Sequence, residues 1–436
     1  MRLCLLFIFL FVASGHLFGQ NEPDSFVVAH RSASETVRLQ KFEMEDLDKP
    51  TASDVARQSL VEQGNPLFQN NKAKLLPSAR EKYTDLFATI RDAHHFIHLE
   101  YFILYNDSVG SALFDILKEK VDQGVEVRVL VDAYGNHKSS SPLTKSILAS
   151  IRQSGIKIAI YDPLHFPYFL NIMHRDHRKI AVIDGRVAYT GGMNIAEYYL
   201  HGKRQTGPWR DMQVRLEGPV VDEFERIFAR IWQKTTGEHL DSLHYRAEHS
   251  PIANREMVVV NREPHKLSRQ IRKAYASAID AAQKEIRIVN PYPTNVRTVR
   301  QALRRALQRG VKVKLMVSSV TDNHIVPEVV GIQMRRMTRH GAEVYYFEGG
   351  FHHSKVMTVD GEFCTVGTTN LDARSMCYDY EVNVFIFDPL TTYQLNNIFD
   401  SDIAECELLT PENFKRRFSL KKRFVGQMFQ VLKGFL

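Results

Sequence analysis

The chain has 436 residues, of which 44% are hydrophobic and 25% are charged, and its formal net charge is +7. These values are typical of a globular protein with two or three domains, and they exclude a multi-span membrane protein, a collagen-like fibre and a mostly disordered chain. The positive excess lies at one end, because residues 414–436 contain seven basic and no acidic residues. This distribution favours contact with an anionic surface, and a membrane fits it better than a long nucleic-acid track.

The first 19 residues have the layout of an export signal. A short positive start precedes an apolar run over residues 3–13, and small and polar residues follow up to Gly19. We favour a cleaved signal peptide, but a retained anchor remains open because Leu17 and Phe18 extend the run. In both cases we expect the body outside the cytoplasm. Residues 20–71 form a polar lead segment in which we expect one helix near residues 53–63, and the sequence does not indicate its role.

Regular helix and strand patterns begin after the lead segment and occur twice. Apolar residues at helical spacing alternate with buried strands in both series, which predicts an α/β fold with mostly parallel or mixed sheets flanked by helices. The segment QGVEVRVLV of the first series matches RGVKVKLMV of the second, so we expect a duplicated domain, over residues 72–240 and 254–408. The expected elements are helices at 79–93, 111–123, 267–282 and 298–307, and strands at 96–104, 125–131, 286–289 and 311–317.

One motif recurs late in each half with identical spacing. It consists of a histidine, a lysine two positions later, an aspartate, and a Gly-x-x-Asn segment, and five matches at the same place in two repeats are not a coincidence. The residues are His177, Lys179, Asp184, Gly191 and Asn194 in the first copy, and His353, Lys355, Asp360, Gly367 and Asn370 in the second.

The pattern within each copy predicts a β-hairpin. The His-x-Lys stretch forms the first strand (HRKIAVID and HSKVMTVD), an Asp-Gly pair makes a tight turn, and a second strand returns to the Gly-x-x-Asn segment. Strand alternation places the histidine and the lysine on one face, and the hairpin returns the asparagine beside them. Asp184 and Asp360 belong to the catalytic signature, but we expect them to hold the hairpin rather than to transfer protons.

This pattern resembles the HxKx4Dx6GxxN signature of the phospholipase D superfamily. In its two-domain members the copies meet across a pseudo-twofold axis and form one active site, so the resemblance implies two phospholipase D-like domains that share one site. Over about residues 65–408 the chain is similar to bacterial cardiolipin synthases of this superfamily. The segments that carry this similarity include HLEYFI (98–103), HRDHRKIAVIDG (174–185), PWRD (208–211), VGTTNLDARS (366–375) and YEVNV (380–384).

The motif residues suit the chemistry of phosphodiesters. One histidine can attack phosphorus to form a phosphohistidine, while the other protonates the leaving alcohol and then deprotonates the incoming one. Lys179 and Lys355 can neutralise the phosphate oxygens, and Asn194 and Asn370 can donate hydrogen bonds to them. The family resemblance implies that one of the pair, His177, is the nucleophile and the other is the acid/base, although the sequence itself is symmetric.

The resemblance also implies a carboxylate behind each catalytic histidine, and no metal or cofactor. The matching positions are Asp211, which we place behind His177, and Glu381, which we place behind His353. Glu100 is an acid in a buried strand, and such residues are usually paired or functional, so we expect it to support the site.

The implied reaction moves a phosphatidyl group from one phosphatidylglycerol to another, giving cardiolipin and releasing glycerol. Transfer to water would make the enzyme a phospholipase D, and another acceptor would make it a different phosphatidyltransferase, such as a phosphatidylserine synthase. We disfavour a secreted phosphodiesterase or nuclease because the charge excess is confined to the tail, so no nucleic-acid partner is expected. We disfavour a non-catalytic lipid-binding protein because both motifs are complete.

The basic tail over residues 414–436 carries apolar residues at helical spacing. This pattern favours an amphipathic helix that lies on an anionic membrane, and the alternative is a terminal helix packed on the body. Together with the N-terminal segment, it predicts a location at the bacterial cell membrane, on its periplasmic face. The oligomeric state stays open. The apolar positions of the tail are Phe418, Val425, Met428, Phe429, Leu432 and Leu436.

Overall fold

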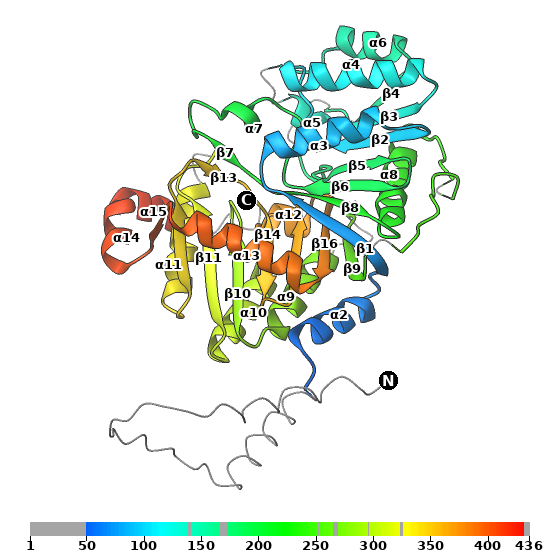
Figure 1. Ribbon diagram of the computed structural model, residues 1–436. Coiled ribbons are helices and arrows are strands. Elements are labelled where there is room, and N and C mark those ends of the chain that lie inside the picture. The colour runs from blue at the N-terminus through cyan, green and yellow to red at the C-terminus, as the bar shows by residue number, and fades with distance from the viewer. Residues whose placement is uncertain are drawn as a thin grey trace, which may run out of the picture. The chain divides into compact units, whose positions relative to one another are not determined.

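A single mixed sheet runs through both halves of the molecule in the computed structural model (Figure 1). Among the described residues it has 15 strands, in the order β17-β12-β11-β10-β14-β15-β16-β9-β1-β8-β6-β5-β2-β3-β4. Parallel pairing is limited to β2-β3-β4 and β10-β11-β12, and all other neighbours are antiparallel. The predicted α/β class is confirmed, and the sheet is mixed rather than mostly parallel.

The structure describes residues 49–137, 141–164, 172–241, 243–251, 253–264, 269–294, 296–322 and 326–430. Residues 50–436 form one unit, which is the unit described below. The predicted signal peptide or anchor at residues 1–19, most of the lead segment and the last six residues of the tail lie outside the described residues.

The elements of the first half follow the predicted helix and strand order. Its strands are β1 (Leu67–Leu76), β2 (Phe96–Tyr101), β3 (Glu126–Asp132), β4 (Lys157–Tyr161), β5 (Lys179–Ile183), β6 (Val187–Gly191), β7 (Trp209–Arg210) and β8 (Gln213–Glu217). Its helices are α3 (Ala79–Arg91), α4 (Ser108–Asp122), α5 (Ala133–His137), α6 (Lys145–Gln153), α7 (Tyr198–His201) and α8 (Val221–Thr236).

The second half repeats this order. Its strands are β9 (Arg255–Arg262), β10 (Glu285–Val289), β11 (Lys312–Ser318), β12 (Glu343–Phe347), β13 (Phe351–His352), β14 (Val356–Val359), β15 (Phe363–Gly367), β16 (Glu381–Phe387) and β17 (Cys406–Leu408). Its helices are α9 (Gln270–Ala281), α10 (Arg297–Gln308), α11 (Val326–Thr338), α12 (Ala373–Cys377) and α13 (Pro389–Ile403).

The duplication is visible in equivalent turns and equivalent strands. Gly124 and Gly310 both have φ of 86°, a conformation that glycine adopts without steric cost, and they end α4 and α10 and lead into β3 and β11. These are the two segments that match in sequence. They occupy corresponding places on the two sides of the central β1–β9 pair, which confirms the predicted repeat.

The lead segment contributes to the folded unit, so the predicted boundary at residue 72 is wrong. The expected helix is present as α2 (Ala52–Glu62), and its residues Ala52, Ala56 and Leu60 are buried in the core of the second half. Strand β1 begins at Leu67 and pairs with both β8 and β9, so it joins the two halves. Four of its ten residues are both polar and exposed, and they lie in its middle, so no continuous or alternating apolar pattern in the sequence marked the strand.

Helices cover both faces of the sheet, and one of the cores belongs to both halves. Helices α8 and α13 contribute Phe224, Phe228, Leu395 and Phe399 to a cluster that also contains residues of β5, β6, β8, β15 and β16. Strands β15 and β16 approach β6 and β8 although they are not neighbours in the ladder. This shared core fixes the motif hairpins of the two halves against each other.

The basic tail is not one amphipathic helix, which corrects the sequence prediction. It forms α14 (Pro411–Arg417) and α15 (Leu420–Phe429), and the side chain of Ser419 caps the second helix. The break occurs because Phe418 is buried in the core, where its ring lies so close to Gly331 that a Cβ there would be 2.3 Å from it. Helix α15 packs on α11. None of the described helices has the length and apolar character needed to cross a membrane.

Candidate active site at the seam between the two halves

Both motif hairpins are present, and their aspartates lie at the turn end. Their first strands begin later than predicted, at Lys179 in β5 and at Val356 in β14, so both motif histidines precede the strands. Asp184 and Asp360 have φ of 52° and 54° and precede the turn glycines. Each carboxylate accepts hydrogen bonds of 2.7–2.9 Å from three consecutive backbone N–H groups at the start of the adjacent strand. Neither residue lines the cavity described below. This geometry supports the expectation that both aspartates hold the hairpin and do not transfer protons.

Each motif lysine is fully buried beside its own histidine. Lys179 Nζ donates a hydrogen bond of 2.5 Å to the carbonyl oxygen of His177, and Lys355 Nζ donates to the carbonyl oxygen of His353. Burial lowers the pKa of Lys179 to about 7 and that of Lys355 to about 8. The negative charge of a bound phosphate would raise the pKa of both lysines and so favour their charged form. The charged ammonium groups would in turn stabilise the bound phosphate.

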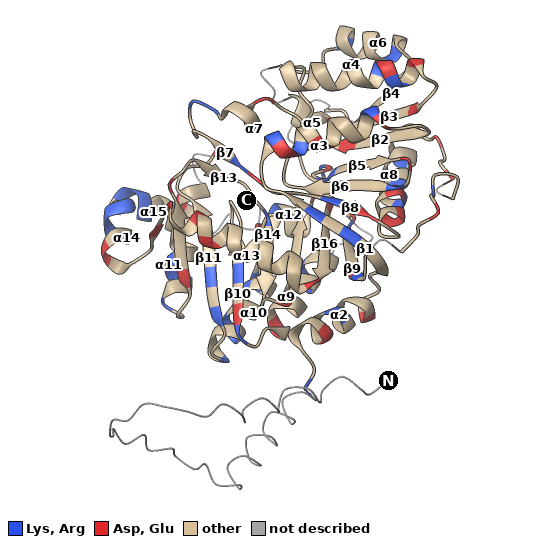
Figure 2. Ribbon diagram, in the orientation of Figure 1, with Lys and Arg blue, Asp and Glu red and all other residues tan. Residues whose placement is uncertain are grey.

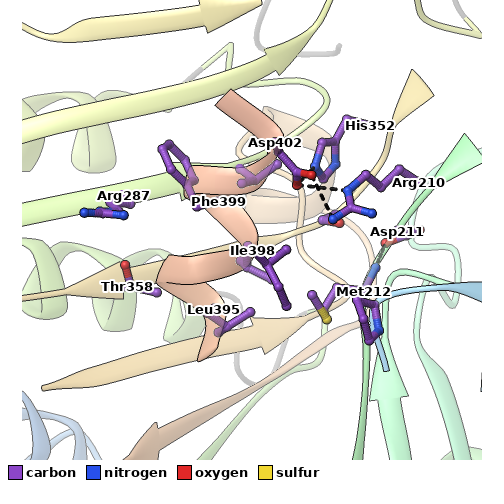
Figure 3. A pocket seen from close by; sticks show the side chains of 14 residues that line it. Arg210, Asp211, Met212, Arg287, His352, Thr358, Leu395, Ile398, Phe399 and Asp402 are labelled. Atoms are coloured by element: carbon purple, nitrogen blue, oxygen red, sulfur yellow. Dashed lines mark hydrogen bonds and ion pairs between the residues drawn. The ribbon is translucent and has the colours of Figure 1, made fainter. Parts of the chain in front are cut away.

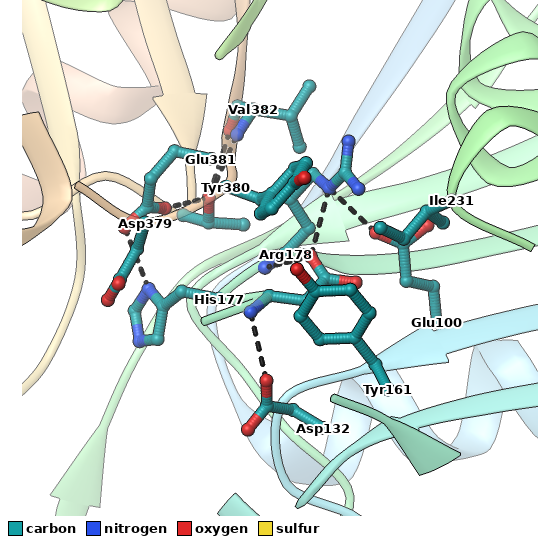
Figure 4. Close-up of polar contacts among 12 residues, drawn as sticks. Glu100, Asp132, Tyr161, His177, Arg178, Ile231, Asp379, Tyr380, Glu381 and Val382 are labelled. Atoms are coloured by element: carbon teal, nitrogen blue, oxygen red, sulfur yellow. Dashed lines mark hydrogen bonds and ion pairs between the residues drawn. The ribbon is translucent and has the colours of Figure 1, made fainter. Parts of the chain in front are cut away.

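The carboxylates that hold the histidine rings are exchanged between the halves, so the predicted pairing is wrong. His177 Nδ1 lies 2.9 Å from Glu381 Oε1, and His353 Nδ1 lies 2.7 Å from Asp211 Oδ2 (Figure 4 shows the first pair). An ionised carboxylate only accepts hydrogen bonds, so each imidazole donates from Nδ1 when its carboxylate is ionised. The lone pair of Nε2 is then free to react. Burial raises the pKa of Glu381 well above its usual value, and the charge of Lys179 opposes this shift.

Two parallel backbone bridges across the seam explain the exchange. Strand β7 lies beside β13, and the backbone N–H of His353 donates to the carbonyl oxygen of Arg210 at 2.7 Å. On the other side Asp176 is bridged to Tyr380, and the N–H of His177 donates to the carbonyl oxygen of Tyr380 at 3.1 Å. In both cases the bridging residue immediately precedes the carboxylate, which therefore reaches the histidine of the opposite half.

An ion pair on one side and a hydrogen bond on the other stabilise the two bridges. Figure 3 shows Asp402 of α13 between Arg210 Nε, at 2.9 Å, and His352 Nε2, at 3.1 Å. On the His177 side, Asp379 accepts a hydrogen bond of 3.0 Å from the backbone N–H of Arg175. These contacts tie the strands of one half to side chains of the other and so hold the imidazoles in place.

Glu100 supports the site indirectly. It is fully buried, and its Oε1 lies 2.7 Å from Nε of Arg178, which also pairs with Asp176 at 3.0 Å (Figure 4). Arg178 stands between His177 and Lys179 in the chain. Glu100 thus stabilises the strand end that carries the motif, and it does not line the cavity.

A cavity of about 510 Å³ opens between the two motifs. Its walls include both motif histidines and both motif asparagines, so the structure brings these four predicted residues together. Asn194 is held on both sides, because its Oδ1 accepts from the N–H of Ile103 and its Nδ2 donates to the hydroxyl of Tyr199. In the described part of the chain, Oδ1 of Asn370 is buried without a hydrogen-bond partner, so this acceptor is available to a donor such as a hydroxyl of a ligand.

The surroundings of the two motif histidines favour their neutral forms. Burial, together with the positive charges of Lys179 and Lys355, holds the pKa of His177 well below its usual value. Burial and Lys355 lower the pKa of His353 to about 4, although Asp211 opposes this shift. A neutral imidazole is the form that attacks phosphorus, and charges from both halves act on the same ring because the two motifs share one site.

Sequence reasoning missed the residues that hold the Gly-x-x-Asn segments. Lys82 Nζ donates to the carbonyl oxygens of Met193 and Asn194 at 3.0 and 2.9 Å, and Tyr83 also donates to the latter. In the second half Asn290 Oδ1 accepts from the N–H of Leu371, next to Asn370. A signal existed for Lys82, since it interrupts the otherwise apolar buried stripe of α3.

Comparison with known proteins agrees with this geometry. The family model described as "Cardiolipin synthase, PLD-like domain" matches residues 86–232 and 275–403. The chain is 34% identical to a "Probable cardiolipin synthase YwiE" of Bacillus subtilis, covering 79% of this chain and 68% of that protein. It is 31% identical to a "Cardiolipin synthase" of Listeria monocytogenes, covering 92% and 83%.

A solved structure shares the fold at low sequence identity. The crystal structure of phosphatidylserine synthase from Haemophilus influenzae Rd KW20 superposes with a TM-score of 0.65 at 15% identity, covering 87% of this chain and all of that one. The family match covers more than half of the chain, in two copies that correspond to the two halves of the structure. The chain therefore belongs to the cardiolipin synthase family of phospholipase D-like proteins.

Proposed function

We propose that the protein is a cardiolipin synthase that transfers a phosphatidyl group from one phosphatidylglycerol to another and releases glycerol. The observation that carries this proposal is the pair of histidines that face one cavity, each oriented through Nδ1 by a carboxylate of the other half. Two imidazoles on opposite sides of one phosphorus atom supply a nucleophile and an acid/base.

In the first step Nε2 of His177 attacks the phosphorus of the donor lipid, and the bond from phosphorus to the glycerol oxygen breaks. His353 gives a proton to the departing oxygen. Lys355 lowers the pKa of His353, and the negative charge of the phosphodiester opposes this effect. The bound substrate therefore raises the pKa of His353, so that this residue can carry the proton. The assignment of the two roles follows the family resemblance.

In the second step a head-group hydroxyl of another phosphatidylglycerol enters the place that glycerol left. His353 takes the hydroxyl proton, the oxygen attacks the phosphohistidine, and the bond from phosphorus to Nε2 of His177 breaks. Cardiolipin leaves, His177 is neutral again, and His353 holds the proton that it needs for the first step of the next cycle. Water in the same place would give phosphatidic acid, which is the hydrolase alternative.

The proposed lipid surface is α15, with a different apolar face from the one expected from the sequence. Leu420, Phe424 and Met428 follow one another at four-residue spacing and are 78%, 68% and 58% exposed. Lysines and arginines surround this stripe on α14 and α15 (Figure 2). Such a surface fits the head-group region of an anionic membrane, and the N-terminal sequence favours a membrane face outside the cytoplasm.

A product assay on the purified protein tests the function. Phosphatidylglycerol is supplied as the sole lipid in mixed micelles, and cardiolipin, phosphatidic acid and free glycerol are measured. We expect cardiolipin and glycerol in equal amounts from the unmodified protein, and neither from His177→Ala or His353→Ala. Phosphatidic acid as the main product would make the protein a hydrolase, and the absence of any lipid product would overturn the proposal.

A further inference from the structure

Lys203 and Arg374 are the cations that line the cavity in the described part of the chain, and neither motif lysine is among the lining residues. Lys203 follows α7 and lines the cavity between the two motif histidines. Its Nζ lies 4.0 Å from the ring centre of Tyr198 and 4.9 Å from that of Trp209. Backbone hydrogen bonds between Lys203 and Gly207, of 3.0 and 2.8 Å, close the loop that carries it. The ammonium is thus held in place by a short closed loop and two aromatic rings.

Lys203 has no carboxylate partner within ion-pair distance in the described part of the chain. Asp322 acts on it only from a distance, and the half-buried position lowers the pKa of Lys203. Arg374, a cation on the opposite wall, is in a different situation, because its Nε pairs with Asp379 at 2.7 Å and its Nη2 donates to the carbonyl oxygen of Ile172. A half-buried cation without a partner is suited to an anion that arrives with a ligand.

The reaction supplies a second anion at a defined distance. The donor lipid presents a neutral glycerol beyond the reacting phosphate, whereas the acceptor lipid presents a glycerol that carries its own phosphate. In the product two phosphorus atoms are separated by six single bonds of about 1.5 Å each, or roughly 7 Å in a direct line. A site for the acceptor phosphate is therefore required roughly 7 Å from the reacting phosphorus atom, on the side of the attacking hydroxyl.

Lys203 shares a neighbour with His353, the residue that deprotonates the hydroxyl. The ring centre of Trp209 lies 5.7 Å from that of His353 and 4.9 Å from Lys203 Nζ, so both residues lie against one indole and line one cavity, within reach of two phosphates of the same product. We propose that Lys203 binds the phosphate of the acceptor phosphatidylglycerol and so selects an anionic lipid over water or a neutral alcohol. This inference rests on the proposed function and adds the acceptor subsite to it.

The test compares two acceptors for one phosphatidyl donor. Phosphatidylglycerol is supplied with and without ethanol, and the rates of formation of cardiolipin, phosphatidylethanol and phosphatidic acid are measured for the unmodified protein, Lys203→Met and Lys203→Arg. We expect Lys203→Met to lower the ratio of cardiolipin to phosphatidylethanol about tenfold, because a charge-assisted contact to the acceptor is lost. Lys203→Arg is expected to restore most of the ratio.

Two control variants show whether the change in the product ratio comes from the charge of Lys203 itself. Lys118→Met removes an exposed lysine of α4, and we expect it to leave the product ratio unchanged. Asp322→Asn is expected to keep or raise the ratio, whereas a fall equal to that of Lys203→Met would mean that the lysine only pairs with Asp322 and would overturn the proposal. An equal loss of all three products in Lys203→Met would also overturn it.

The test distinguishes this proposal from the proposed function. If the unmodified protein forms phosphatidylethanol or phosphatidic acid but no cardiolipin, the synthase assignment is wrong. If it forms cardiolipin and Lys203→Met forms the same ratio of products, the synthase assignment stands and the acceptor subsite is wrong.

Discussion

The two halves carry the same motif on equivalent strands, yet the surroundings of their histidines differ. The ring of His353 has three aromatic neighbours, Trp209, Phe351 and Tyr292, with ring centres 5.7, 5.3 and 6.3 Å away. In the described residues the only aromatic neighbour of His177 is Phe102, at 4.9 Å. The motif is therefore symmetric in its reacting atoms and asymmetric in its walls, which gives the two imidazoles different environments for different roles.

A second difference lies at the second residue of the Gly-x-x-Asn segment. In the first half this residue is Gly192, where a Cβ would be 2.0 Å from Oδ1 of Asp211. In the second half it is Thr368, whose hydroxyl donates to Oε2 of Glu381. In the first half the absence of a side chain at Gly192 leaves space for Asp211, whereas in the second half Thr368 binds Glu381 directly. Equivalent backbone positions therefore hold the two carboxylates in different ways.

The largest expected effect comes from removing one of the two motif histidines at a time. We expect His177→Ala and His353→Ala each to lower turnover of phosphatidylglycerol on the order of 10⁴-fold. With a phosphodiester that has a nitrophenol leaving group, which needs no proton, His353→Ala should still accumulate a phosphohistidine. Acid-labile phosphate attached to the protein is the measurement, and its presence in His177→Ala would reverse the assigned roles.

The next largest effects are expected from changing Gly192 and Thr368, the residues that position the carboxylates of Asp211 and Glu381. We expect Gly192→Ala to displace Asp211 and to lower turnover about a hundredfold, because a shift of this kind misplaces the acid/base. Thr368→Val keeps the shape but removes one hydrogen bond to Glu381, and a loss of about tenfold is expected. Circular dichroism and thermal unfolding serve as the control for folding. Equal losses in the two variants would contradict the difference between the halves.

The exchange of carboxylates can be tested directly on the imidazoles. Asp211 raises the pKa of His353, so Asp211→Asn is expected to lower that pKa further and to leave the signals of His177 in place. The measurement is a pH titration of labelled histidine by NMR, with turnover expected to fall about tenfold or more. A shift confined to His177 would show that the carboxylates serve their own halves.

A smaller effect is expected from pH, and it arises from the lysines of both halves. We expect the charged ammonium groups of Lys179 and Lys355 to bind the phosphate. These groups lose their protons as the pH rises through the pKa of about 7 for Lys179 and about 8 for Lys355. We therefore expect kcat/KM for a soluble short-chain phosphatidylglycerol to fall as the pH rises above about 7 to 8, since this ratio reports the free enzyme. A ratio that stays constant up to pH 10 would contradict the lowered pKa values.

The smallest effect concerns α15, which follows the second half. We expect Phe424→Ser to weaken binding to vesicles that contain phosphatidylglycerol severalfold, since it removes the centre of the exposed stripe of α15. The matched control is Leu390→Ser, which removes an exposed apolar side chain of α13. Sedimentation with vesicles measures both, and equal weakening would show that α15 is not the lipid surface.

The sequence was sufficient for the features that depend on local pattern. The hairpins, the turn aspartates and the repeat of β3 in β11 follow from strand alternation, turn residues and matching segments, and the structure confirms them. The reacting residues were found because their spacing is identical in the two copies.

The sequence was insufficient where a contact crosses the seam or a pattern is absent. The spacing from histidine to carboxylate differs between the copies, and the bridge of Tyr380 to Asp176 that decides the pairing has no sequence signature. Strand β1 is polar because much of it is exposed, and the break in the tail at Phe418 depends on its contact with Gly331. Each of these features is set by tertiary packing rather than by local preference.

The exchange of carboxylates has a consequence for the time at which activity arises during synthesis. His177 belongs to the first half, but its partner Glu381 is added to the growing chain 204 residues later. A nascent chain that has completed and folded its first half still holds an imidazole with no orienting carboxylate and no acid/base opposite it. Lipid chemistry therefore cannot start on an unfinished chain, and completion of the second half is the event that turns the enzyme on.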